Sequence, residues 1–135
     1  AERMKMRSPH IVPLSTQVIA LFKQLKPISG HYPYIFIGRN NRSKPISKES
    51  VTQVIELLGY KGRATGHGFR HTMSTILHEK GFNSVWIEMQ LAHVDKNTIR
   101  GTYNHAQYLE KRKEMMQWYS DRLYPKMNME IYNAL

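Results

Sequence analysis

Apolar residues recur at helical spacing along most of the chain, and a glycine or proline follows several of these runs. Apolar side chains three and four positions apart share one side of an α-helix, which must bury them against another surface. Gly is favoured just past a helix end, and Pro disrupts a helix interior. The pattern predicts helices over about 16–26, 68–80, 84–93, 96–101 and 106–122, and one between Ser47 and Gly59.

A second pattern, with period two, lies near the start of the chain. Met4 and Met6 alternate with the row Arg3, Lys5 and Arg7, and an apolar run resumes after Ser8-Pro9, which predicts a β-hairpin over 3–14. A short strand or an extended segment is predicted over 34–37. The expected fold is therefore mainly α (α+β), a single domain over 1–135 with a small antiparallel hairpin near its N-terminus, a folded core over 1–123 and a tail over 124–135.

The charge balance predicts a polyanionic partner. Lys and Arg number 20 against 10 Asp and Glu, which gives a formal charge of +10 and a pI near 9.9. Nucleic acid is the first candidate, and an acidic membrane surface is a weak second because no helix pairs a lysine-rich face with an aromatic one. The chain has no cysteine, which excludes disulfides and Cys-based zinc sites and fits a cytoplasmic location.

Three short segments contain residue types suited to phosphate chemistry. His67 and Arg70 lie at the start of a predicted helix, whose N-terminus attracts anions, and His93 and Tyr103 follow in later segments. An arginine can donate two parallel hydrogen bonds to phosphate oxygens and keeps its charge. Tyrosine, with a free pKa of about 10, becomes a nucleophile when cations stabilise its anion and a base takes its proton.

Each of these residues also has an ordinary structural interpretation. A lone His-x-x-Arg is commonly a surface pair, a lone tyrosine commonly packs, and His93 fits a helix C-terminus. His71 lies opposite the expected apolar stripe of its helix and is predicted to be exposed. Trp86 and Trp118 are predicted to have packing roles. The combination of residues, their order and the basic background favour the catalytic interpretation.

The same residues resemble the tyrosine recombinases, or phage-type integrases, and specifically the integrases of satellite phages and genomic islands. The resemblance is strongest in Thr65-Gly66-His67-Gly68-Phe69-Arg70-His71-Thr72, in Ile87-Glu88-Met89-Gln90-Leu91-Ala92-His93 and in Thr102-Tyr103-Asn104-His105. It extends from the predicted hairpin to about Leu123. The resemblance implies the C-terminal part of an integrase catalytic domain, with site-specific DNA integration and excision as its activity.

The resemblance also implies a role for each matching residue. Tyr103 would attack the scissile phosphate and form a 3′-phosphotyrosyl intermediate. Arg70 and His93 would bind the non-bridging oxygens, and His67 would act in proton transfer. Lys5 on the hairpin would protonate the leaving 5′-oxygen. No metal, ATP or other cofactor is expected.

Two departures from the family pattern limit what this chain should do alone. The family uses another arginine upstream of the hairpin lysine, and this chain starts at Ala1-Glu2-Arg3, within a predicted strand and without an initiator Met. We therefore expect a fragment of a longer protein, with little or no recombination by itself. The glycine that usually precedes the third-motif histidine is Ala92 here, a change expected to be minor.

Double-stranded DNA, at attachment sites, is the expected partner. The segment after the nucleophile often docks on a neighbouring subunit in this family, so a homo-oligomer, a tetramer in the synapse, is expected through the C-terminal helix or tail. Packing of that helix on its own domain is an equal alternative. The residues predicted to contact the DNA backbone are Arg3, Arg7, Arg39, Arg42, Lys44, Lys61, Arg63 and Arg100.

Three other functions compete with recombination. A non-catalytic basic DNA-binding module would have the same charge with a tyrosine that only packs. A type IB topoisomerase would share the tyrosine chemistry but relax DNA. A zinc hydrolase built on His67 and His71 is a distant third, because the glutamate that follows the first histidine of the metalloprotease motif is missing.

Overall fold

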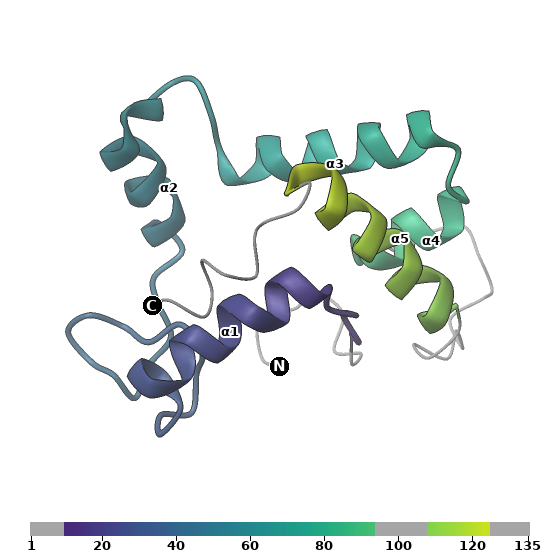
Figure 1. Ribbon diagram of the computed structural model, residues 1–135. Coiled ribbons are helices and arrows are strands. Elements are labelled where there is room, and N and C mark those ends of the chain that lie inside the picture. The colour runs from purple at the N-terminus through teal and green to yellow at the C-terminus, as the bar shows by residue number, and fades with distance from the viewer. Residues whose placement is uncertain (1–9, 94–107, 125–135) are drawn as a thin grey trace. The chain divides into compact units, whose positions relative to one another are not determined.

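The protein is described by a computed structural model that covers residues 10–93 and 108–124. Its regular structure in these ranges is helical, which confirms the prediction of a mainly α fold (Figure 1). In the part of the chain described, no helix has the length and apolar character needed to span a membrane. The elements are α1 (Thr16–Ser29), α2 (Ser50–Ile55), the π-helical turn η1 (Glu56–Tyr60), α3 (Gly66–Lys80), α4 (Ser84–Gln90) and α5 (Leu109–Leu123).

The described residues contain one isolated antiparallel bridge, Ile37 to Pro45, and no strand, so of the two alternatives for 34–37 the strand is wrong and the segment makes a single bridge. Backbone bonds flank the bridge: Gly38 N donates to Lys44 O at 2.7 Å, and Ile46 N donates to Phe36 O at 3.0 Å. Pro45 has no N–H, which prevents the ladder from extending. The predicted hairpin lies mostly outside the described residues, and 10–14 contain no strand, so the hairpin stays a prediction.

The chain divides into two compact units. Among the described residues, the first unit contains 16–73, and the second contains 10–15, 74–93 and 108–124. Helix α3 begins in the first unit and ends in the second. The assignment of 1–135 to a single domain stays a prediction.

Helix α1 continues through Pro27 to Ser29, where the prediction ended it near 26. A proline removes the hydrogen bond that its own N–H would donate, but the turn after it can still close. Here Gly30 N donates to Lys26 O at 2.8 Å, and Ser29 Oγ donates to Leu25 O at 3.3 Å. These bonds keep the last turn helical.

Gly59 and Gly81 each follow a helix predicted from the sequence, and both end that helix, as expected of glycine. Gly59 has φ of +83° at the end of η1, and Gly81 has φ of +89° directly after α3. At Gly81 the chain makes the paired bonds of a Schellman turn: Gly81 N donates to His78 O at 2.9 Å, and Phe82 N donates to Leu77 O at 3.1 Å. The start of α2 differs from the prediction, because its N-cap residue is Glu49 and not Ser47.

The second unit has a small core in which α4 packs against α5 (Figure 1). Both predicted tryptophan packing roles are confirmed by ring contacts: Trp118 lies edge-on to Phe82 at 5.4 Å between centroids, and Trp86 lies 6.4 Å from Tyr108. The buried apolar side chains of this unit are Leu77, Ile87, Leu91 and Met115.

The apolar residues of the last helix are unequally buried. Leu109, Met116, Tyr119 and Leu123 recur at near-heptad spacing along α5, but Leu123 is 51% exposed. The fully buried side chains of α5 are Arg112 and Met115. The buried face therefore includes a charged residue, which apolar periodicity alone does not reveal.

Candidate active site

The N-terminus of α3 is set by a side-chain cap. Thr65 Oγ1 accepts a hydrogen bond from Gly68 N at 2.9 Å, and Thr65 O accepts the first intrahelical bond from Phe69 N at 3.1 Å. A Cβ on Gly68 would lie 3.1 Å from Thr65 Oγ1, so a side chain there would crowd the cap. The cap starts the helix at Gly66, earlier than the predicted start near 68, and thereby places His67 in its first turn.

His67 and Arg70 share one face of this helix start. Residues at i and i+3 of an α-helix have Cβ atoms about 5–6 Å apart. Both side chains belong to exposed residues, and so does His71, as predicted. Phe69 is 60% exposed, so the predicted apolar stripe of α3 is buried only toward the end of the helix, at Leu77. The two residues therefore present cationic and proton-accepting groups together, at the positive end of the helix dipole.

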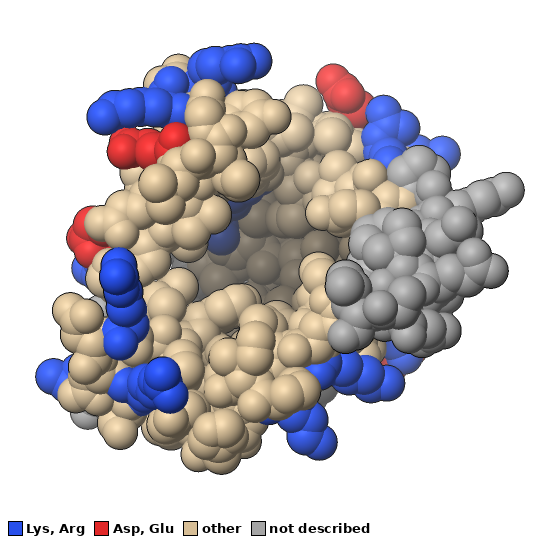
Figure 2. Space-filling model, turned by 60° about the vertical axis from the view of Figure 1, so that its left-hand side comes forward, with Lys and Arg blue, Asp and Glu red and all other residues tan. Residues whose placement is uncertain are grey.

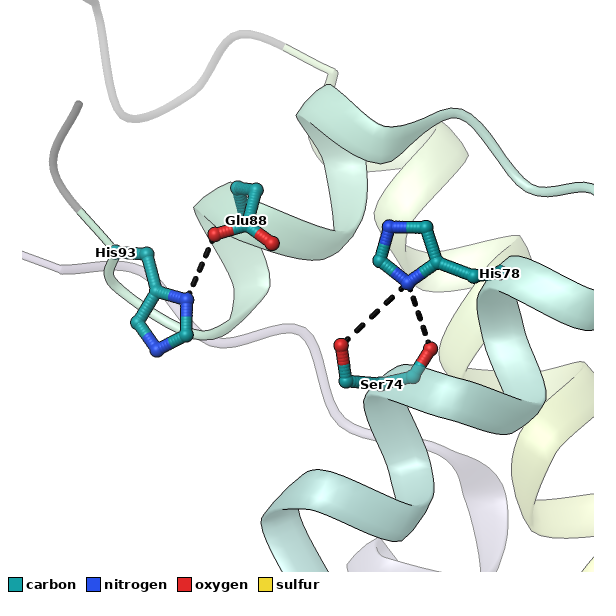
Figure 3. Close-up of polar contacts among 4 residues, drawn as sticks. All are labelled: Ser74, His78, Glu88 and His93. Carbon is teal, nitrogen blue, oxygen red and sulfur yellow. Dashed lines mark hydrogen bonds and ion pairs between the residues drawn. The ribbon is translucent and has the colours of Figure 1, made fainter.

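His93 follows a tight turn at the end of α4, in the second unit. Ala92 has φ of +52°, in the left-handed region, and its N–H donates to Met89 O at 3.2 Å. The next N–H, of His93, donates to Glu88 O at 3.0 Å. His93 Nδ1 also lies 2.7 Å from Glu88 Oε2 (Figure 3). The histidine is therefore beyond the helix end, and both its backbone and its ring contact one glutamate.

Replacing Ala92 with glycine is expected to raise the free energy of unfolding by about 0.5–1 kcal/mol, because glycine adopts positive φ without a Cβ clash. The Ala92→Gly variant of the 135-residue chain can be compared with wild type by chemical denaturation. The matched control is Ala64→Gly, since Ala64 has no positive φ; that change should be neutral or destabilising. A loss of stability in Ala92→Gly would contradict the strain assigned to this turn.

Two polar contacts of the second unit escaped the sequence analysis. One is the Glu88–His93 pair, and the other is the buried guanidinium of Arg112. Arg112 Nε and Nη2 donate to Gln90 Oε1 at 3.2 and 2.9 Å, and Nη2 also donates to Ile11 O at 2.6 Å. Burial lowers the pKa of Arg112. The one sequence signal for the burial of Arg112 is its position three residues before Met115, on the same side of the helix. Apolar periodicity does not detect this signal, because arginine is not apolar.

The basic residues of the first unit that are predicted to contact DNA lie in two exposed segments, and Figure 2 shows more basic than acidic side chains on the face drawn. In the loop 38–47, Arg42 Nη1 donates to Tyr32 Oη at 3.2 Å. Before α3, the Arg63 guanidinium lies 5.4 Å from the Tyr60 ring centre, and Lys61 lies 3.8 Å from Glu56. Arg39 and Lys44 are exposed in the same loop as Arg42.

The structure brings His67 and Arg70 together on α3 and places His93 in the other unit. Lys5, Tyr103, Arg3, Arg7 and Arg100 lie outside the described residues, so their roles stay predictions. Within the described residues, no group of three or more His, Cys, Asp or Glu side chains is arranged to hold a metal ion.

Comparison with known proteins gives a consistent set of relatives. The model of the phage integrase family matches residues 2–110. The integrase of Shigella phage Sf6 is 49% identical over 94% of this chain, and prophage integrase IntS of Escherichia coli (strain K12) is 48% identical over 94%. The integrase of Enterobacteria phage P4 is 40% identical over 98% of the chain and 30% of its own length.

The chain spans 33% of the length of the Sf6 and IntS integrases. The search of solved structures gave no significant match. Because the family model covers most of the chain, and the relatives align along nearly all of it, the chain belongs to the phage integrase family.

Proposed function

We propose that this chain contributes the nucleophile and most of the phosphate-binding residues to a tyrosine-type, site-specific DNA recombinase. The observation that supports this most directly is the shared face of His67 and Arg70 at the capped start of α3. A guanidinium at the positive end of a helix dipole suits a phosphate, and a neighbouring imidazole can exchange a proton with an attacking hydroxyl. The family membership of the chain agrees with this chemistry.

In the proposed reaction, Tyr103 Oη attacks the phosphorus of the scissile phosphodiester. A new bond from Tyr103 Oη to phosphorus replaces the bond from phosphorus to the 5′-oxygen. His67 accepts the tyrosine proton, and Lys5 donates a proton to the leaving 5′-oxygen. Arg70 and His93 stabilise the negative charge on the non-bridging oxygens. The phosphotyrosyl bond conserves the energy of the broken phosphodiester, so a 5′-hydroxyl of another strand can reverse the reaction without ATP.

The exposed basic segments are proposed to bind the DNA backbone around this site. In the loop 38–47, backbone bonds on both sides of the Ile37–Pro45 bridge hold the cations on a closed turn. A closed turn loses less conformational freedom on binding than a free segment would. The proposed contacts are Arg39, Arg42, Lys44, Lys61 and Arg63, together with Arg3, Arg7 and Arg100.

The end of α5 is proposed to contact a neighbouring protomer on DNA. One face of α5 is used within its own unit, where Arg112 and Met115 are fully buried. The C-terminal end of the helix is different, since Leu123 is 51% exposed and Tyr124 is 46% exposed. Helix α5 can therefore pack on its own unit through Arg112 and Met115 and contact a neighbouring protomer through its C-terminal end.

The proposal is tested by trapping the covalent intermediate. A nicked or phosphorothiolate DNA substrate carrying the attachment site should give a denaturation-resistant adduct with the full-length protein. Tyr103→Phe should abolish the adduct, because it removes the attacking oxygen. The matched control is Tyr108→Phe, which removes a hydroxyl from a tyrosine whose ring contacts Trp86 and should leave the adduct intact.

The outcomes also separate the competing functions. An adduct that persists in Tyr103→Phe would refute the assigned nucleophile. DNA binding with no adduct in wild type would indicate a non-catalytic module. Relaxation of supercoiled DNA without joining of two attachment sites would indicate a topoisomerase.

A further inference from the structure

We infer that Glu88 is a positioning residue that fixes the ring orientation and tautomer of His93. This inference rests on the proposed function, in which His93 binds a phosphate oxygen. Glu88 contacts His93 twice: its backbone carbonyl accepts from His93 N at 3.0 Å, and its carboxylate lies 2.7 Å from His93 Nδ1. The two contacts therefore hold His93 at two points, its backbone N–H and its imidazole ring.

The turn at Ala92 makes the double contact possible. Its left-handed conformation reverses the chain after α4, so that the residue following it returns toward the last helical turn. Glu88 lies two residues before the end of that helix, in its last turn, and faces the returning ring (Figure 3). A glutamate elsewhere on α4 would not meet both the amide and the imidazole.

The carboxylate determines which ring nitrogen is protonated. An ionised carboxylate only accepts hydrogen bonds, so the Nδ1 facing it must bear a proton. Nε2 then lies on the opposite edge of the ring, away from Glu88 (Figure 3). A carboxylate that accepts a hydrogen bond from one nitrogen of a histidine fixes its tautomer, and this is a general way to aim the other nitrogen at a ligand. In the proposed site, that ligand is a non-bridging phosphate oxygen.

Solvent exposure argues against a mainly stabilising role for this pair. The side chains of His93 and Glu88 are 54% and 45% exposed. Ion pairs that are this accessible to water contribute little to folding. The contact should therefore change the geometry and chemistry of the ring much more than the stability of the chain.

A second histidine of the same unit provides an internal control. His78 Nδ1 lies 2.8 Å from Ser74 O and 3.5 Å from Ser74 Oγ, within α3 (Figure 3). A backbone carbonyl also requires a protonated Nδ1. His78 should therefore show the same tautomer as His93, while its own partner does not involve Glu88.

The first experiment reads the tautomers directly. Long-range ¹H–¹⁵N spectra of the histidine-labelled 135-residue chain, recorded where imidazoles are neutral, should show protonated Nδ1 for both His93 and His78. Glu88→Ala should shift His93 toward the Nε2-protonated form that free imidazole prefers, with His78 unchanged. Glu88→Gln should keep the Nδ1-protonated form, because the amide oxygen still accepts. An unchanged His93 tautomer in Glu88→Ala would overturn the inference.

The second experiment measures single-turnover DNA cleavage by the full-length protein. Loss of the carboxylate behind a metal-ligating histidine typically costs roughly 10–100-fold in activity, and by analogy Glu88→Ala should lower the cleavage rate by a similar factor. Glu88→Gln should restore most of the rate. In a His93→Ala background, Glu88→Ala should cause no further loss. A wild-type cleavage rate in Glu88→Ala, or an equal additional loss in the double variant, would also overturn the inference.

The two experiments separate this inference from the proposed function. If the wild-type protein forms no adduct through Tyr103, the proposed function fails, and the spectra still decide whether Glu88 holds the His93 ring. If the adduct forms and the His93 tautomer does not respond to Glu88, only the inference fails.

Discussion

Arg70→Ala in the full-length protein is expected to lower the single-turnover rate of DNA cleavage by roughly 10²–10³-fold, the typical cost of losing one charge-stabilising donor from an active site. The folded chain should tolerate the change. Arg70 belongs to the exposed first half of α3, and alanine is the best helix former. The rate is measured with a substrate that traps the adduct, and the free energy of unfolding is measured in parallel.

Two further variants identify what Arg70 contributes. Arg70→Lys keeps the charge but loses the planar fork that binds two phosphate oxygens, so cleavage should remain strongly impaired. Arg63→Ala removes a nearby exposed cation that lies over the Tyr60 ring. It should weaken DNA binding modestly and leave the cleavage rate at saturating DNA near wild type. Wild-type cleavage by Arg70→Ala would exclude the phosphate-binding role.

Arg112→Met is expected to lower the free energy of unfolding of the 135-residue chain by roughly 2–3 kcal/mol, since it removes charge-assisted bonds and strands a buried acceptor. Gln90 Oε1 receives two of the Arg112 bonds, and Ile11 O receives the other. Methionine matches the length of the arginine stem and fills the space, so the loss reports the polar contacts more than a cavity. Chemical denaturation measures the effect.

One effect opposes this loss of stability. Folding of the wild-type chain must remove the Arg112 cation from water, and folding of the Arg112→Met chain does not. Arg112 Nη1 is buried and has no hydrogen-bond partner in the described parts of the chain. Replacing both partners removes the stranded acceptor, so Arg112→Met with Gln90→Leu should recover part of the lost stability. Lys111→Met changes an exposed neighbour that pairs with Glu114 and should alter stability by less than about 0.5 kcal/mol. A fully stable Arg112→Met chain would contradict the assigned role.

The helical nature of the chain was predictable because it depends on local patterns. Apolar spacing located the helices, and the positive φ of Gly59 and Gly81 explains why the predicted stops were right at those positions. Helix ends depended on finer chemistry. The Thr65 cap moved the start of α3 to Gly66, and the bonds at Ser29 and Gly30 extended α1 past Pro27.

The effect of having Ala92 where the family usually has glycine was predicted to be minor from the sequence, and the structure shows a reason for a larger effect. From the sequence, a small residue in place of glycine was expected to matter little. In the structure this residue has φ of +52°. In this conformation the backbone energy depends on whether a Cβ atom is present, more than on the size of the side chain. The turn therefore keeps the glycine geometry with a residue that is strained in it.

The sequence by itself determined the helical class, the family and the residue types available for phosphate chemistry, because these depend on local periodicity and on motifs. Only the tertiary structure decided which polar groups meet. Glu88 and His93 meet because a left-handed turn reverses the chain, and Arg112 and Gln90 meet because α5 packs on α4 across 22 positions of sequence. Neither contact has a sequence period, since each depends on where a turn or a packed helix places the partner.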